Sequence, residues 1–151
     1  MRADVEKLID AILDEADCID DLIDVMREQR EAMRERDTEA VNSLMDEARN
    51  ISFEVQTHEN IRADIAGKLA AANSCDAKVS SLILIMQDDE RKEFKKAADI
   101  LAQSVFLLKS EIMILSGLID QNEKYTSMLL SEWRRINGDT LFGSGAADFK
   151  G

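Results

Sequence analysis

Apolar residues recur at alternating intervals of four and three positions along the second half of the chain. This spacing keeps the same side of an α-helix facing its neighbour, and it is typical of a packed helical seam. It predicts one continuous helix from Asp89 to Ile136, about 70 Å long. Two polar residues, Asn122 and Thr126, interrupt the seam. Its positions are Phe94, Ala98, Leu101, Val105, Leu108, Ile112, Leu115, Ile119, Asn122, Thr126, Leu129, Trp133 and Ile136.

The first half of the chain carries two series of the same kind. They predict a helix from Ala3 to Glu35 and another from Thr38 to Ala72. Between them, the side chain of Asp37 can accept hydrogen bonds from free amides of the second helix. Two long helices joined by so short a corner are expected to fold back as an antiparallel hairpin. The series are Val5, Ile9, Ile12, Ala16, Ile19, Ile23, Met26 and Met33, interrupted by Arg30, and then Val41, Leu44, Ala48, Ile51, Val55, His58, Ile65 and Leu69, interrupted by Arg62.

A short third helix ending at Met86 is expected before the final one. Stepping the seam backwards from Phe94 reaches mostly polar positions, so the pattern indicates a break near Gln87. Asp88 or Asp89 is then expected to cap the final helix.

Composition supports a fold of few, long helices. The 151 residues include no proline and six glycines, four of which fall in the last fourteen positions. The predicted class is all-α: an antiparallel helical bundle, or long coiled-coil-like hairpin, with three long helices and one short helix. We expect residues 1–137 to form a single helical bundle domain and residues 138–151 a flexible C-terminal tail.

The chain carries a net charge of −12, from 31 acidic and 19 basic residues. Such a charge repels phosphate backbones, so nucleic-acid binding is not expected. The densest basic region, Arg27 to Arg36, alternates with glutamates and is expected to be a solvated helix face. Apolar runs are too short to cross a bilayer and no signal-peptide core is seen, so we expect no direct membrane insertion. Cys18 and Cys75 have no metal or redox spacing, which favours a cytoplasmic protein.

No motif for catalysis, metal binding or cofactor binding is found. The sequence lacks a glycine-rich phosphate loop, a GxSxG elbow, an HExxH motif and the Glu-x-x-His of di-iron bundles. The single histidine, His58, falls on a seam and is expected in the core or at its boundary. We predict a protein that is not an enzyme and that holds no metal or cofactor. One row of aspartates can be a solvated face, a docking surface for a basic partner or a cation site. The row is Asp10, Asp14, Asp17, Asp21 and Asp24.

Aromatic residues gather near the C-terminus. Tyr125, Trp133, Phe142 and Phe149 all lie in the last 27 residues, and Trp and Tyr are over-represented among interface anchors. Trp133 is interpreted either as such an anchor or as a core residue. Phe142 follows the predicted helix and has little core to join. The C-terminal quarter is therefore the expected partner surface.

Three local motifs carry a family resemblance. They are Ile119-Asp120-Gln121-Asn122, Met128-Leu129-Leu130 and Thr140-Leu141-Phe142-Gly143. Together with the helix order, they resemble the FlgN-type flagellar export chaperones, and the likeness covers nearly the whole chain. The resemblance implies a cytoplasmic protein that holds the C-terminal helical segments of the two hook–filament junction proteins. It also implies delivery of that cargo to the export gate of the flagellar type III secretion system.

By position, Phe142 would take the role of the family's tail tyrosine, which docks at the gate; it keeps the ring but lacks the hydroxyl. Asn122 is expected to fix helix register. The alternative function is a structural coiled-coil adaptor or self-associating helical bundle without a secretion role, and the sequence leaves monomer and homodimer open. The predicted partner-binding residues are Leu129, Leu130, Trp133, Ile136, Leu141 and Phe142.

Overall fold

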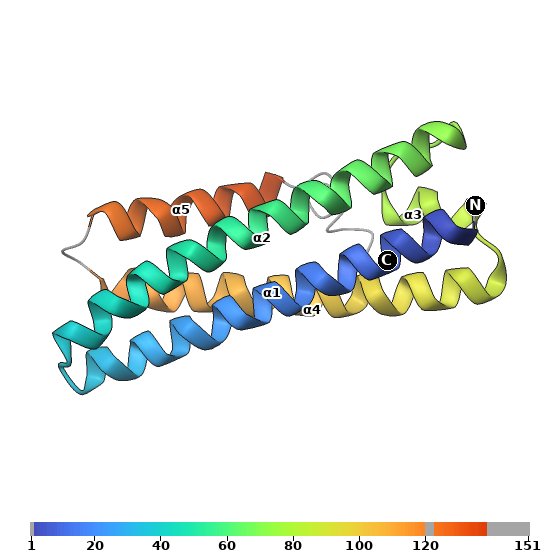
Figure 1. Cartoon of the computed structure of the whole chain (residues 1–151). Coiled ribbons are helices and arrows are strands. Elements are labelled where there is room, and N and C mark those ends of the chain that lie inside the picture. Colours follow the sequence, from blue (N-terminus) through green and yellow to red (C-terminus); the bar gives the residue numbers. More distant parts are fainter. Residues whose placement is uncertain (1, 120–122, 139–151) are drawn as a thin grey trace.

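The chain folds into a bundle of long α-helices that lie side by side (Figure 1). The computed structural model describes residues 2–119 and 123–138. Within these residues the fold is helical and contains no strand, which confirms the all-α bundle with three long helices. The elements are α1 (Arg2–Arg34), α2 (Thr38–Ala72), α3 (Val79–Leu82), the 3-10 helix η1 (Ile83–Ile85), α4 (Asp88–Leu118) and α5 (Glu123–Gly138).

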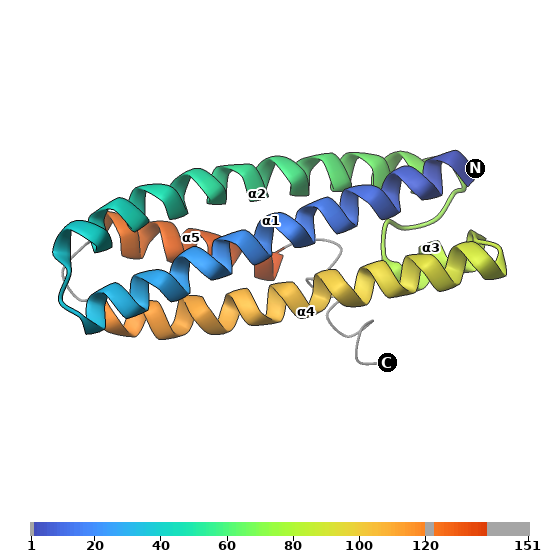
Figure 2. The ribbon, with the colours of Figure 1, turned by 60° about the horizontal axis from the view of Figure 1, so that its bottom comes forward.

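The predicted hairpin of α1 and α2 is confirmed. At the corner, the side chain of Asp37 accepts a hydrogen bond from the amide of Ala40 at 3.1 Å and so caps α2. Arg36 turns the chain there with a positive φ of 60°. α1 packs against α2 on one side and against α4 on another (Figures 1 and 2). Apolar residues from all three helices form one continuous core.

The predicted break before α4 is confirmed, but the capping residue is different. Gln87, and not Asp88 or Asp89, is the N-cap of α4. Its side chain accepts from the helix backbone, and its own amide donates to Glu90 Oε1 at 3.0 Å. This reciprocal pair satisfies two free amides. The two aspartates lie in the first turn, where the helix dipole favours acidic side chains.

The predicted continuous helix over residues 89–136 is wrong. The chain breaks between α4 and α5, and α5 folds back beside α4 and α2 (Figures 1 and 2). Gly117 lowers helix propensity just before the break. The Thr126 hydroxyl donates to the carbonyl of Ile119 at 3.4 Å, so it pairs a group that the end of α4 leaves free. Thr126 therefore serves the corner between two helices, and Asn122 lies outside the described residues.

Charged side chains bridge the long helices inside the bundle. Arg62 Nε of α2 lies 2.9 Å from Glu15 Oε1 of α1, and both side chains are buried. On the other side of α1, Arg27 and Arg30 donate to Glu111 Oε1 of α4 at 3.1 and 2.8 Å. The basic stretch of α1 is thus only partly a solvated face. Sliding one helix along another would separate these charges, which disfavours other registers.

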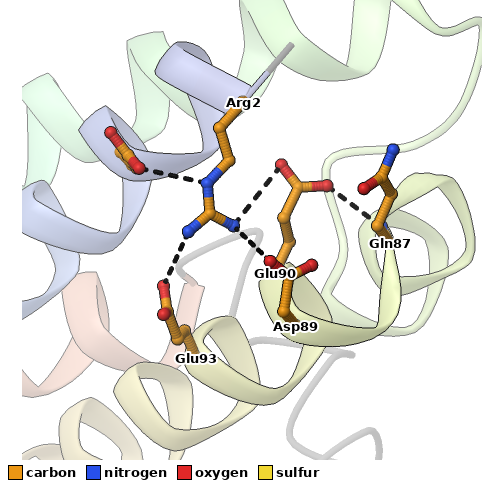
Figure 3. A network of polar contacts seen from close by, with 6 residues as sticks. Arg2, Gln87, Asp89, Glu90 and Glu93 are labelled. Atoms are coloured by element: carbon orange, nitrogen blue, oxygen red, sulfur yellow. Dashed lines mark hydrogen bonds and ion pairs between the residues drawn. The ribbon is translucent and has the colours of Figure 1, made fainter.

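Arg2 joins the start of α1 to the start of α4 (Figure 3). Its guanidinium lies 3.5 Å from Asp89, 3.6 Å from Glu93 and 4.0 Å from Glu90. Most of this network is solvent-exposed, and an exposed ion pair contributes only about 0–1 kcal/mol. The network positions the two helix ends and adds little to stability.

The aspartate row of α1, exemplified by Asp14 and Asp21, is exposed, as both a solvated acidic face and a docking surface for a basic partner require. No group of three or more potential metal ligands comes together within residues 2–119 and 123–138. His58 is half-buried on α2, at the boundary of the core as predicted.

Candidate partner-binding surface on α5

α5 closes the bundle at the end that holds the corner between α1 and α2 (Figure 1). Tyr125, Leu129 and Ile136 are buried and belong to the main core. Their spacing places them on one side of the helix, and Glu132 fills the fourth inward position. The Tyr125 hydroxyl donates to Gln29 Oε1 of α1 at 2.5 Å. α5 is therefore docked by apolar contacts and by hydrogen bonds of buried groups.

Glu132 is the centre of a polar cluster between α5 and α2. Its side chain accepts a hydrogen bond from the Ser52 hydroxyl at 2.5 Å. Arg135, one turn further on, forms ion pairs with both Glu132 and Glu59 of α2. One guanidinium therefore faces two carboxylates.

Burial changes the acidity of Glu132. Only 6% of its surface is exposed, and this burial raises the pKa of its carboxyl to about 6, while the hydrogen bond from Ser52 offsets part of the rise. Burial also raises the pKa of the Tyr125 hydroxyl, and Arg49 opposes this effect. The inward side of α5 thus contains a carboxyl that titrates closer to neutral pH than an exposed glutamate does.

The predicted partner-binding residues on α5 face two directions. Leu129 and Ile136 are buried in the bundle, whereas Leu130 is 42% exposed on the outward side. The structure therefore does not present the four α5 residues as one surface. Leu141 and Phe142 lie outside the described residues.

Trp133 is half-buried and packs against the core from the edge of α5. The ammonium group of Lys109 on α4 lies 5.8 Å from the centre of its ring, a geometry in which the aromatic face attracts a cation. Burial lowers the pKa of Lys109. Trp133 therefore packs partly in the core, and its role as an interface anchor stays a prediction.

Comparison with models of protein families gives a match to the FlgN protein family over residues 1–147. This chain belongs to the FlgN family. Curated proteins give no match, and neither do solved structures. The family is one of chaperones and suggests a role in flagellar export, and it is not known for enzymatic activity.

The polar inward side of α5 in this FlgN-family chain was not predicted from the sequence. The predicted seam places Thr126 and Trp133 on the packed side of the helix. The buried residues are instead Tyr125 and Glu132, each one position earlier. With the buried leucine and isoleucine of the same helix, these two positions give an equally regular spacing of four, three and four. That alternative register was visible, but it required a glutamate in the core.

The raised pKa of Glu132 predicts that the free energy of unfolding rises as the pH falls from 7 to 5. The folded state binds a proton with a pKa of about 6, whereas the ordinary value is 4.5. Protons are therefore taken up by the folded state first, and stability is lost as the pH rises through 6. We expect a gain of about 1 kcal/mol over this range. Urea unfolding followed by circular dichroism at several pH values measures it.

The control for this prediction is Glu132→Gln, which can still accept from Ser52 but does not titrate. Other carboxylates contribute to both proteins, so the difference between the wild-type and variant curves isolates Glu132. A second variant, Asp14→Asn, removes an exposed carboxylate of α1 and should leave the wild-type profile unchanged. Parallel curves for the wild type and Glu132→Gln would show that Glu132 does not titrate in this window.

Proposed function

We propose that this chain is a cytoplasmic chaperone of the flagellar type III secretion system. It binds the C-terminal helical segments of hook–filament junction proteins and delivers them to the export gate. The observation that carries this proposal is the match to the FlgN family across residues 1–147. The fold is compatible with the task, because unpolymerised cargo exposes apolar helix seams and another helix can cover them.

Cargo contact is assigned to the outward side of α5. Leu130 is exposed and Trp133 is half-buried, so both can meet a partner while the bundle stays folded. A tryptophan at such a position supplies a large apolar contact, as interface anchors do. Leu129 and Ile136 support this surface from inside, because their burial keeps α5 on the bundle.

Contact with the export gate is assigned to Leu141 and Phe142. This assignment rests on the sequence, in which Phe142 stands where the family has its docking tyrosine. The aromatic ring is retained, so an apolar contact can be made, whereas a hydrogen bond from the missing hydroxyl cannot.

Replacing Trp133 with alanine is expected to weaken cargo binding by tenfold or more, because truncating an anchoring aromatic typically costs about 2 kcal/mol or more. The probe is a synthetic peptide that spans the C-terminal helix of a hook–filament junction protein. Isothermal titration calorimetry with the full chain gives the dissociation constant. Size-exclusion chromatography shows whether a defined complex forms.

Leu84→Ala is the control, because Leu84 is an exposed apolar residue of η1 at the opposite end of the bundle (Figure 1). It should bind the peptide as the wild type does. Unchanged affinity in Trp133→Ala would remove Trp133 from the cargo surface. A wild-type protein that ignores the peptide and self-associates with rising concentration would instead favour a structural adaptor.

A further inference from the structure

The outward side of α4 between Ile100 and Leu118 carries no charged side chain, although 33% of the chain is charged. Phe106 is 63% exposed and Met113 is 65% exposed. α4 is also the described helix that is long and apolar enough to cross a membrane, with 39% of its most apolar window buried. A surface helix normally directs a polar side to solvent, and this side of α4 departs from that rule. We name this surface the α4 outer face, and its central residues are Phe106, Leu107, Ser110, Met113, Ile114 and Gly117.

The two charged residues of this stretch turn away from the α4 outer face. Lys109 lies over the ring of Trp133 on α5. Glu111 is buried and pairs with Arg27 and Arg30 of α1. The α4 outer face therefore lies between the side that meets α5 and the side that meets α1.

The α4 outer face has two apolar ridges with small residues between them. Residues seven positions apart on a helix lie nearly in line and form such ridges. Ser110 and Gly117 lie between them, and nothing lies within 4 Å of the place that a Cβ atom of Gly117 would take. Glycine inside a helix costs about 1 kcal/mol relative to alanine, and packing within the bundle does not require it here. Small residues let the backbone of a docked helix come close. The ridges are Leu107 with Ile114, and Phe106 with Met113.

Toward the start of α4, the same side carries three lysines, and Asp88 and Asp89 lie beside two of them. Lys92, Lys95 and Lys96 are exposed and line a groove of about 640 Å³ that continues past Ile100 and Leu107. None of the three lysines forms an ion pair with the residues that the structure describes. The groove also contains two carboxylates, Asp99 and, from α1, Asp20, whose side chain accepts from the Ser104 hydroxyl at 2.7 Å.

We propose that the α4 outer face binds an amphipathic helix whose apolar side covers the ridges and whose acidic end lies on Lys92, Lys95 and Lys96. The uncharged side of α4 from Ile100 to Leu118 is about 27 Å long, which matches five turns of a partner helix. Opposite charges at one end fix the direction in which the helix lies. This inference rests on the proposed function, because the proposed cargo is helical. It adds a second binding surface to the one proposed on α5.

Charge distinguishes this occupant from two others. A second copy of the chain would also carry a charge of −12, and an anionic membrane surface would repel the same field. The three lysines place positive charges locally within that field, among the carboxylates of Asp20 and Asp99. A helix with a few acidic residues at one end can contact these lysines without placing a whole acidic surface against the protein.

The test uses two synthetic amphipathic helices of about 18 residues and the full chain. One peptide has three glutamates in its first turn, and the other has three lysines there. We expect Phe106→Glu to lower the affinity for the glutamate peptide by tenfold or more. The triple variant Lys92→Glu, Lys95→Glu, Lys96→Glu should bind the glutamate peptide at least tenfold more weakly and the lysine peptide at least tenfold more tightly than the wild type does. Fluorescence anisotropy measures each affinity.

Phe53→Glu is the matched control, because Phe53 is 68% exposed on α2, away from the α4 outer face. It should bind both peptides as the wild type does. Equal loss in Phe53→Glu and Phe106→Glu, or no exchange of peptide preference in the triple variant, overturns the proposal. Binding to anionic vesicles or dimerisation that Phe106→Glu abolishes overturns it as well. If the designed peptide binds and the junction-protein peptide does not, the proposed function fails while this surface assignment stands.

Discussion

Replacing Glu15 with alanine is expected to destabilise the protein by about 3–5 kcal/mol. Arg62 is 1% exposed and lies 2.9 Å from Glu15, so the variant removes a carboxylate that pairs with a buried guanidinium. Arg62→Ala should destabilise the protein by a similar amount, because it removes the guanidinium that pairs with the buried Glu15 carboxylate. Urea unfolding followed by circular dichroism measures both effects, and an unchanged m value shows that the midpoint shift reflects stability.

The controls separate loss of the pair from loss of one partner. A double variant, Glu15→Met with Arg62→Met, removes both charges and fills similar space, so we expect it to be as stable as the wild type or more stable. Asp64→Ala breaks an exposed pair with Lys68 at 3.0 Å on α2 and should cost less than about 1 kcal/mol. Equal losses in Glu15→Ala and Asp64→Ala would show that the buried pair has no special weight.

The hairpin of α1 and α2 could be predicted because its signals are local. Seam spacing gives the two helices, and Asp37 marks the corner with a side chain that caps the next turn. The pairing of Arg62 with Glu15 could not be predicted, because the partners are 47 positions apart. In the sequence, Arg62 only interrupts a seam. A periodic pattern shows which side of a helix is buried. It does not show which residue of another helix forms an ion pair with a charged residue on that side.

The turn between α4 and α5 was missed for a different reason. The four–three spacing can be continued through the corner only by including Asn122 and Thr126, whereas the buried positions of α5 shift by one residue to Tyr125 and Glu132. The polar seam residue Thr126 was the local sign of the turn, and it was interpreted as part of a continuous helix. This error carried over to the candidate surface, because folding back places Leu129 and Ile136 inside the bundle.

The α4 outer face could not be predicted from the seam alone. The sequence separates the buried side of α4 from the rest, but a nearly uncharged stretch hides where burial ends. Only the packing of α1 and α5 shows that Phe106 and Met113 remain exposed. The residues that could be predicted are those that build the bundle, and the surfaces left for partners depend on which sides the other helices cover.

Replacing Tyr125 with alanine is expected to loosen α5 before it affects the rest of the bundle. Tyr125 is fully buried and its hydroxyl donates to Gln29, and truncating a buried aromatic typically costs about 3–5 kcal/mol. α5 is the last described helix, and it packs against parts of α2 and α4 and against Gln29 of α1, so it can open as a separate unit. Native-state hydrogen exchange should show α5 amides exchanging on the order of a hundredfold faster or more, because each 1.4 kcal/mol corresponds to about tenfold. Amides in the centres of α1 and α2 should keep most of their protection.

Two variants of α5 test whether the buried ring is the cause. Tyr125→Phe keeps the ring and removes the hydroxyl that donates to Gln29, so we expect a smaller cost of about 1–2 kcal/mol. Leu130→Ala shortens an exposed side chain of the same helix and should leave α5 protection near that of the wild type. If Tyr125→Ala instead lowered the protection of α1 and α2 as much as that of α5, the four helices would open as one cooperative unit. In that case a partner bound at Trp133 would act on the stability of the whole bundle, and not only on the docking of its last helix.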